Sequence, residues 1–272
     1  MDTFVAGDGH LECQVRGSGE PLLMIHGAVI SDSFEAVAGR LSQSCQLITY
    51  RRRGFGGSSP ARDAGTIADQ ATDAVALLDH LGIGAAHITG HSYGGIVALQ
   101  MALDAPQRVH SLALLEPPLF FATPSGVEFG ARAAAIKEIY QSGDTAGALV
   151  AFLTAVCGED PVPRISKTLP ATWYGQALSD APALFGADFA SLGPWAFTEA
   201  QARSITQPAL LVLGDRSGPL FVESFEMLKD WLPNAEPFVL EDATHLLQME
   251  NPGGMVEGLL SFLERHPTPT RV

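Results

Sequence analysis

The sequence predicts an α/β fold in which a mostly parallel central sheet carries helices on both faces. Three observations support this prediction. Short apolar runs that suit strands alternate with segments that suit helices, and such alternation is typical of parallel sheets joined by right-handed crossovers. Some of these runs are apolar throughout, as expected of strands buried on both faces. Polar residues follow the runs directly, at the sheet edge where ligands bind in such folds.

The composition indicates a well-buried globular chain. The 272 residues suffice for one large domain or a domain with an insertion, and 46% of them are hydrophobic. The formal net charge of −14 argues against nucleic acid and anionic membrane surfaces as partners. The one basic run, Arg51-Arg52-Arg53, is too short for a nucleic-acid footprint and is expected to be structural.

Cysteine usage and the N-terminal segment favour the cytoplasm. Cys13, Cys45 and Cys157 lie far apart and show neither a disulfide framework nor the spacing of metal ligands. The acidic N-terminus lacks the basic-then-apolar run of a signal peptide. The longest apolar stretch, residues 146–157, is shorter than the roughly 20 residues that span a bilayer. We therefore expect no metal and no membrane partner; nothing indicates the oligomeric state.

The first elements are short strands followed by a well-marked helix. An Asp8-Gly9 turn is expected to join a hairpin, and the predicted strands are 3–6, 11–16, 21–25 and 46–50, with a short helix over 34–41. The next helix, over 66–81, begins with Thr66 and Asp69 in capping-box spacing. Its apolar residues recur on one face, and Gly82 suits its C-terminal end.

The remaining elements continue the alternation, with one interruption. A strand over 85–89 precedes a helix that ends near Asp104, and a buried strand follows over 109–115. The alternation is then lost until about residue 200. It resumes with the predicted strands and helices 208–213, 219–232 and 237–240, and with a final helix that Asn251-Pro252 opens.

A glycine-flanked serine stands where a predicted strand turns into a helix. Residues Gly90-His91-Ser92-Tyr93-Gly94 form a G-x-S-x-G pattern. Glycine relieves the crowding of such a sharp turn, and the helix N-terminus offers free N–H groups to a group that the serine attacks. A serine hydroxyl needs a base of near-neutral pKa, an acid that orients the base, and donors for the developing oxyanion.

These motifs together resemble the α/β-hydrolase-fold enzymes of the esterase, lactonase and haloalkane-dehalogenase-like group. The matching pieces lie between about residues 20 and 265 and are His26-Gly27, the run 53–58, the run 90–95, Leu114 to Pro117, Leu213 to Asp215, and Thr244-His245. The resemblance implies a Ser-acid-His triad with Ser92 as nucleophile and His245 as base. Serine at the turn argues against dehalogenase and epoxide hydrolase chemistry, because those relatives carry aspartate there.

Two carboxylates compete for the role of triad acid. Many relatives place the acid in a Gly-x-x-Asp pattern, but the fourth position from Gly214 is Ser217, which cannot supply a negative charge. Asp215 lies two residues earlier and is the alternative. A second known arrangement puts a glutamate after the strand that follows the nucleophile helix, and Glu116 matches it. We therefore expect Glu116 to be the acid.

The oxyanion hole is expected to use two backbone N–H groups. One belongs to Tyr93, the residue after the nucleophile. The other should belong to Ala28, which follows His26-Gly27, with Val29 as a possible substitute.

Residues 117–200 are expected to form a helical lid inserted into a core of residues 1–116 and 201–272. The resemblance places a lid there, and the segment holds more than half of the chain's aromatic residues. That enrichment suggests an aromatic-lined, apolar pocket. The residues expected to line it are Phe120, Phe121, Trp173 and Trp195.

Together these features predict a serine hydrolase that cleaves a small apolar carboxylic ester or lactone through an acyl-enzyme, without cofactor or metal. One alternative keeps the site but changes the bond, as in C–C hydrolysis or perhydrolysis. Another is a non-catalytic small-ligand receptor on the same fold.

Overall fold

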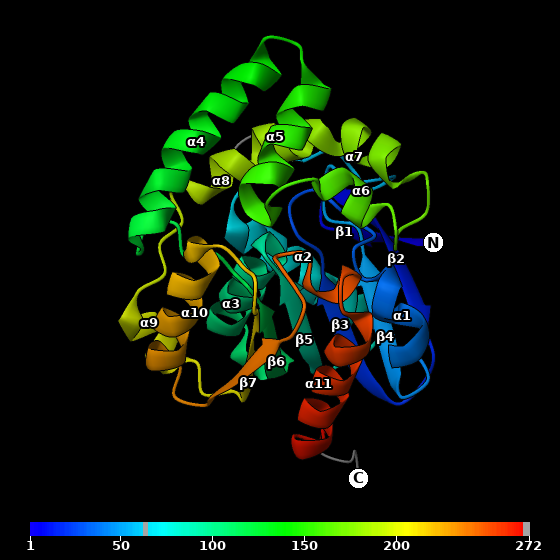
Figure 1. The fold of residues 1–272 in the computed structure, drawn as a ribbon. Helices are drawn as coiled ribbons and strands as arrows, with labels where there is room; N and C mark the ends of the chain where they lie inside the picture. The colour runs from blue at the N-terminus through cyan, green and yellow to red at the C-terminus, as the bar shows by residue number, and fades with distance from the viewer. Residues whose placement is uncertain (62–64, 269–272) are drawn as a thin grey trace.

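In the computed structural model, which describes residues 1–61 and 65–268, an eight-stranded sheet runs through the centre of the molecule (Figure 1). The strand order is β1-β2-β4-β3-β5-β6-β7-β8. Strand β2 runs antiparallel to both of its neighbours, and all other neighbouring pairs are parallel. The strands are β1 (Asp2–Ala6), β2 (Gly9–Arg16), β3 (Glu20–Ile25), β4 (Cys45–Tyr50), β5 (Ala86–His91), β6 (Val109–Leu115), β7 (Ala209–Gly214) and β8 (Ala235–Leu240). The predicted fold class is confirmed.

Successive residues of the central strands point to opposite faces of the sheet, and each face has its own hydrophobic core. In β3, Leu22 and Met24 pack in the core that includes α1 (Glu35–Leu41) and α11 (Pro252–Arg265). Leu23 and Ile25 pack in the other, larger core. The helices on that side are α2 (Ile67–His80), α3 (Tyr93–Asp104) and α10 (Pro219–Trp231). A strand covered on both sides favours apolar residues at most positions, and β3, β6 and β7 are largely apolar.

Helix ends follow the capping chemistry that the sequence predicts. The Thr66 hydroxyl accepts from the Asp69 amide at 3.1 Å, and the Asp69 carboxylate accepts from the Thr66 amide at 2.8 Å. Asn251 caps α11 by accepting from the Gly254 amide at 2.9 Å. The turn between β1 and β2 differs by one residue from the prediction: Ala6 pairs with Gly9, so the turn is formed by residues 7–8.

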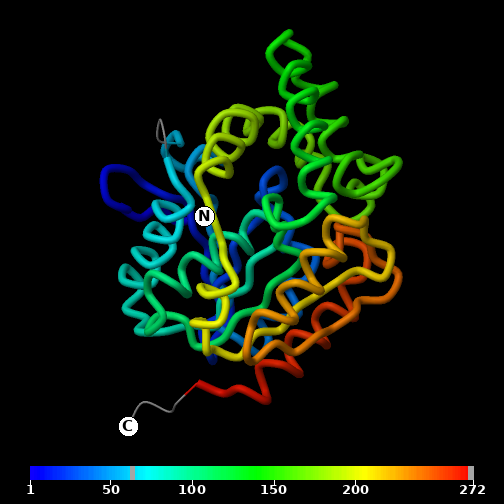
Figure 2. The backbone as a smooth tube through the Cα atoms, turned by 90° about the vertical axis from the view of Figure 1, so that its left-hand side faces the viewer, coloured from blue at the N-terminus to red at the C-terminus, as the bar shows by residue number. Residues whose placement is uncertain are grey.

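The segment between β6 and β7 is helical and contributes no strand, and all of its residues are described. Helices α4 (Pro124–Gln141) and α5 (Thr145–Cys157) form a hairpin that projects beyond the carboxyl ends of the strands (Figures 1 and 2). The other elements above the sheet are α6 (Pro161–Ile165), α7 (Trp173–Pro182), the π-helical η2 (Ala183–Asp188) and α8 (Phe189–Leu192). Helix α9 (Glu199–Ser204) instead lies beside α10 at the side of the sheet. Two 3-10 turns, η1 (Pro106–Arg108) and η3 (Leu247–Met249), complete the described elements.

Each arginine of the run after β4 has a carboxylate partner. Arg51 contacts Asp32 at 2.9 Å. Arg53 contacts Asp73 of α2 at 2.7 Å, and both of these side chains are buried. Arg52 contacts a residue of the segment between β6 and β7, described below. The expected structural role of this run is consistent with these contacts.

Among the described residues, no helix combines the length and apolarity needed to cross a membrane. Cys13, Cys45 and Cys157 are buried thiols, and none of them forms a disulfide.

The close approach of α3 to β3 predicts a strong effect at Gly94. An ideal Cβ on Gly94 would lie 2.1 Å from the Ile25 carbonyl oxygen, so Gly94→Ala requires a backbone shift. We expect the free energy of unfolding to fall by about 3 kcal/mol, measured by urea denaturation. Gly39 of α1 is the matched control, because a Cβ there meets nothing within 4 Å; Gly39→Ala should raise stability by up to about 1 kcal/mol. Equal effects of the two substitutions would contradict this geometry.

Candidate active site

Ser92 occupies the turn between β5 and α3 with φ of 53° and ψ of −120°. This conformation is rare for a residue with a side chain and costs on the order of 1–3 kcal/mol. The flanking glycines permit the turn, because an ideal Cβ on Gly90 would lie 2.3 Å from the carbonyl oxygen of Gly94. The Ser92 amide donates to the Leu115 carbonyl at 2.8 Å, which ties the turn to β6.

His245 and Glu116 form a buried hydrogen-bonded pair. His245 Nδ1 lies 2.6 Å from Glu116 Oε2, and the two side chains are 5% and 0% exposed. The other carboxylate oxygen accepts from the Gly214 amide at 2.7 Å and from the Ser217 hydroxyl. The Phe221 ring stacks on the imidazole at a centroid distance of 3.7 Å. With Nδ1 engaged, Nε2 is the ring nitrogen left for a reacting group, and the described residues provide it with no hydrogen-bond partner.

Asp215 lies close in sequence but takes a different role. Its side chain is exposed, and its carboxylate accepts from the Ala243 amide at 3.0 Å. This contact supports the loop that leads to His245. Ser217, at the position where many relatives carry the acid, instead donates to Glu116. In the sequence, only the spacing from Gly214 drew attention to Ser217, and it did not indicate the contact with Glu116.

Burial controls the charge of the pair. It raises the pKa of Glu116 to about 7, while the hydrogen bonds from Ser217 and Gly214 act in the opposite direction. Burial also lowers the pKa of His245, which keeps the imidazole neutral. A neutral imidazole beside an ionisable carboxylate can accept a proton from a nearby hydroxyl.

His91, the residue before Ser92, helps to hold His245 in place. His91 Nε2 donates to the His245 carbonyl at 3.0 Å, and the two rings lie with centroids 4.9 Å apart. Burial lowers the pKa of His91 to about 3, so its ring is also neutral. The resemblance gave this residue no role, and no sequence pattern signals the contact.

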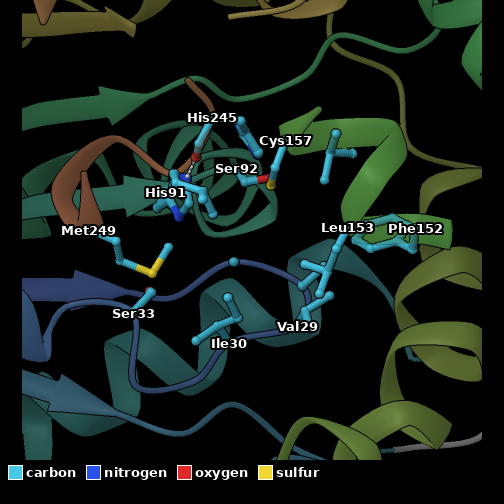
Figure 3. Close-up of a pocket in the computed structure, with 14 residues that line it drawn as sticks. Val29, Ile30, Ser33, His91, Ser92, Phe152, Leu153, Cys157, His245 and Met249 are labelled. Atoms are coloured by element: carbon cyan, nitrogen blue, oxygen red, sulfur yellow. Dashed lines mark hydrogen bonds between the residues drawn. The ribbon is translucent and has the colours of Figure 1, made fainter. Parts of the chain in front are cut away.

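Two small apolar cavities meet at Ser92. The first, of about 40 Å³, is lined by Ser92 and His245 together with side chains from the loop after β3 and from α5 (Figure 3). The second, of about 30 Å³, is also lined by Ser92, with Tyr93, Phe221 and side chains from the segment between β6 and β7. Ala28 lines both cavities. Among the described residues, no hydrogen bond joins Ser92 Oγ to His245 Nε2; in enzymes such contacts often tighten only when substrate binds.

The two expected oxyanion donors lie beside Ser92. An ideal Cβ on Gly27 would lie 3.4 Å from the Ser92 Cβ, so the loop bearing Ala28 touches the serine. Within the described residues, the backbone N–H groups of Ala28 and Tyr93 have no hydrogen-bond acceptor. Val29, the possible substitute, lines the first cavity only.

Ser33 is a polar residue of the first cavity that the sequence did not single out. Its side chain is 1% exposed, and among the described residues its hydroxyl has no hydrogen-bond partner. Most of the cavity wall is apolar and includes Val29, Ile30 and Met249 (Figure 3). A buried hydroxyl without a partner costs about 1–3 kcal/mol, which a polar atom of a ligand can recover.

Of the four aromatic residues expected to line the pocket, only Phe120 does so. Phe121 is 55% exposed. The Trp173 indole donates to the Ser166 hydroxyl at 3.0 Å, and the Trp195 indole donates to the Gln100 side chain at 2.9 Å. The expectation was wrong for these three residues, because Phe121 faces solvent and the two indoles are held by Ser166 within the helical segment and by Gln100 of α3. The cavity wall uses Phe129, Phe152, Phe189 and Phe221 instead.

Among the described residues, no group of histidine, cysteine, aspartate or glutamate side chains is arranged to hold a metal ion. The groups that the structure brings together at Ser92 are its hydroxyl, the His245 imidazole and the Glu116 carboxylate.

Comparisons with known proteins identify the family and the fold. A family model described as the alpha/beta hydrolase fold matches residues 20–252. A Variovorax paradoxus protein whose name proposes carbamate hydrolase activity is 40% identical over 109 residues, covering 39% of this chain and 41% of the relative. The carboxylesterase YbfK of Bacillus subtilis is 26% identical over 270 residues, covering 94% of this chain and 84% of that protein.

A thermophilic esterase from Thermogutta terrifontis has a similar solved structure, with a TM-score of 0.82, 22% identity and 97% of both chains covered. At that identity the likeness shows the fold alone. The matched part of this chain spans less than half the length of the Variovorax relative.

Proposed function

This chain belongs to the alpha/beta hydrolase fold family, and we propose that it is a serine hydrolase that cleaves a carboxylic ester or lactone through an acyl-enzyme. The observation that carries the proposal is the strained Ser92 beside a buried His245–Glu116 pair whose Nδ1–Oε2 distance is 2.6 Å. A histidine oriented by a carboxylate, with its second nitrogen free and a serine in the same cavity, is the arrangement that activates a hydroxyl nucleophile.

The proposed reaction has two halves. Ser92 Oγ attacks the carbonyl carbon while His245 Nε2 takes its proton, and the resulting imidazolium is stabilised by ionised Glu116. The N–H groups of Ala28 and Tyr93 stabilise the negative oxygen of the tetrahedral intermediate. His245 then returns its proton to the departing alcohol oxygen. Water, activated by the same histidine, hydrolyses the acyl-enzyme and restores Ser92.

We further infer that residues 117–200 act as a lid, in which the elements from α4 to α8 cover the site. Side chains from α4, α5 and α8, including Phe129, Phe152 and Phe189, line the cavities at Ser92. These walls exclude water from an apolar substrate. The small cavity volumes favour a substrate with short groups on both sides of the scissile bond, or movement of the lid for a larger one.

Two alternatives remain to be distinguished. The same site suits C–C hydrolysis or perhydrolysis of related carbonyl substrates. A non-catalytic receptor on this fold would instead bind a small ligand without turnover. Hydrolysis of a p-nitrophenyl acyl ester that depends on Ser92 distinguishes the enzyme from the receptor. A screen of acyl esters, lactones and diketones then ranks the bonds.

The role of Ser92 predicts a single covalent label. A serine-directed phosphonate should add to Ser92 and abolish p-nitrophenyl ester hydrolysis, because the strained turn and His245 make this hydroxyl nucleophilic. Mass spectrometry of peptides identifies the labelled residue. Ser92→Ala should lose both labelling and turnover, whereas the control variant Ser58→Ala should keep both. Full turnover in Ser92→Ala would overturn the proposal.

The contacts of the two carboxylates predict opposite outcomes for their substitution. Glu116→Gln should lower kcat by about 10³- to 10⁴-fold, because the imidazolium loses its negative partner. Asp215→Asn should stay within a few-fold of wild type, since Asp215 contacts only the loop. Steady-state kinetics of both variants provides the measurement, with circular dichroism to check folding.

The pH profile provides a second readout of Glu116. Above a pKa of about 7 the carboxylate is ionised and competent; below it, the pair takes up a proton. The kcat/KM of wild type should therefore fall as pH decreases through about 7.

For the two substitutions, higher activity in Glu116→Gln than in Asp215→Asn would show that the acid is misassigned.

The unpartnered Ser33 hydroxyl predicts a preference for an oxygen atom in a short substrate chain. The isosteric pairs are methoxyacetyl against butyryl esters, and 2-methoxyethyl against butyl esters. Ser33→Ala should lower the kcat/KM ratio of at least one pair by about fivefold, which corresponds to one hydrogen bond of about 1 kcal/mol. Comparing ratios between wild type and variant cancels intrinsic reactivity. Unchanged ratios for both pairs would mean that Ser33 does not contact substrate.

A further inference from the structure

A buried ion pair joins the helical segment to the loops around Ser92. Arg52, after β4, contacts Asp188, at the junction of η2 and α8, through two hydrogen bonds of 2.9 and 2.8 Å. The side chains are 1% and 3% exposed. The guanidinium also donates to the Gln70 side chain at 2.6 Å and lies over the rings of Phe55 and Tyr93. Such a pair contributes little net stability compared with apolar packing, so its directed contacts suggest another purpose.

The same guanidinium holds the peptide unit that carries the Ala28 N–H. Arg52 Nη2 donates to the Gly27 carbonyl at 2.8 Å, and His26 Nδ1 donates to the same oxygen at 2.7 Å. His26 Nε2 accepts from the Arg52 amide at 3.0 Å, which determines the His26 tautomer. Burial and the nearby Arg52 charge lower the pKa of His26, so its ring is neutral. In a trans peptide the N–H points away from the carbonyl, so these contacts orient the Ala28 N–H.

The second oxyanion donor, Tyr93, contacts the same stretch of the helical segment through its side chain. The Tyr93 hydroxyl lies 2.6 Å from the Ser191 hydroxyl, and Ser191 donates to the Asp188 carbonyl at 2.8 Å. The Gln70 amide donates to the Tyr93 hydroxyl at 2.7 Å. Asp188 and Ser191 lie about one helical turn apart, so one short stretch of the helical segment contacts the residues that position both donors.

We propose that Asp188 and Ser191 are positioning residues that assemble the oxyanion hole, Asp188 through Arg52 and the Gly27 carbonyl, and Ser191 through the Tyr93 side chain. The helical segment therefore contributes to the rate of the chemical step in addition to covering the substrate. Displacing η2 and α8 disorders both donors at once, so the uncovered site is a poor catalyst. This inference rests on the proposed function.

The test compares Asp188 with a second buried carboxylate of the same segment. Asp180 of α7 accepts from the Gly56 amide at 3.0 Å and from the Gln176 side chain. It ties the segment to the sheet domain, and in the described part of the chain it makes no hydrogen bond to the residues that hold the oxyanion donors. Asp180→Asn is therefore a matched control for loss of a buried lid contact.

Asp188→Asn should lower kcat for a p-nitrophenyl ester by about 10- to 100-fold, with KM within about threefold. Removal of a whole oxyanion donor costs about 10²- to 10³-fold, and a misoriented donor should cost less. Ser191→Ala should give a smaller fall in kcat, which Ser191→Thr should restore because it keeps the hydroxyl. Asp180→Asn should change kcat by less than about threefold.

A transition-state analogue separates positioning from general destabilisation. A trifluoromethyl ketone forms a tetrahedral adduct that requires the oxyanion hole, whereas the matched methyl ketone binds mainly as a carbonyl ligand. For Asp188→Asn, affinity for the trifluoromethyl ketone should fall in proportion to kcat/KM, and affinity for the methyl ketone should stay constant. Thermal denaturation with both ligands checks that the folded fraction is equal.

Three outcomes distinguish failure of the inference from failure of the proposed function. If wild type hydrolyses the ester through Ser92 but Asp188→Asn resembles Asp180→Asn, the positioning role is wrong and the serine hydrolase stands. If both ketone affinities fall equally in Asp188→Asn, the ion pair is merely structural and the inference is also overturned. If wild type shows no Ser92-dependent turnover or labelling, the proposed function itself fails.

Discussion

The packing of the first turn of α3 against the carboxyl end of β3 is the constraint on which the rest of the structure depends. The carbonyl of Ile25 occupies the space where a side chain at Gly94 would lie, so the first turn of α3 lies directly against the end of β3. Ser92 is thereby forced into a strained conformation, and Gly27 lies against it. The strain persists because hydrogen bonds from both sides over-determine the turn. The same contact therefore fixes the serine turn and brings the loop after β3 against it.

Buried charge is the second organising feature, and it is arranged in two separate groups. On one side of Ser92, Glu116 lies beside His245 and accepts hydrogen bonds from the end of β7 and the loop that follows it. On the other side, Arg52 is neutralised by Asp188 and contacts the Gly27 carbonyl. Charges placed in an apolar interior act strongly on their neighbours because little water screens them. The first group is suited to proton transfer, and the second to orientation of backbone dipoles.

Much of the fold and part of the site could be predicted from local patterns. Fully apolar strand runs, the Thr66–Asp69 capping box and the glycines around Ser92 each constrain the backbone over a few residues, and the structure agrees with them. Counting from Gly214 places Ser217 at the usual acid position, and the family resemblance then favoured Glu116 over Asp215; the structure brings Glu116 to His245. The aromatic wall was less predictable, because whether Trp173 or Trp195 faces the cavity depends on how short helices pack.

The sequence alone therefore determined the order of strands and helices, the sharp turn at Ser92 and the strand ends that carry His245 and Glu116, because these depend on periodicity, capping and glycine at fixed spacings. Only the tertiary structure decided that Asp188 pairs with Arg52, 136 residues away, and that Ser33 is left without a partner in an apolar cavity. Contacts of that kind carry no local signature. They arise when distant segments are packed together and each buried polar group must find a partner or remain unpaired.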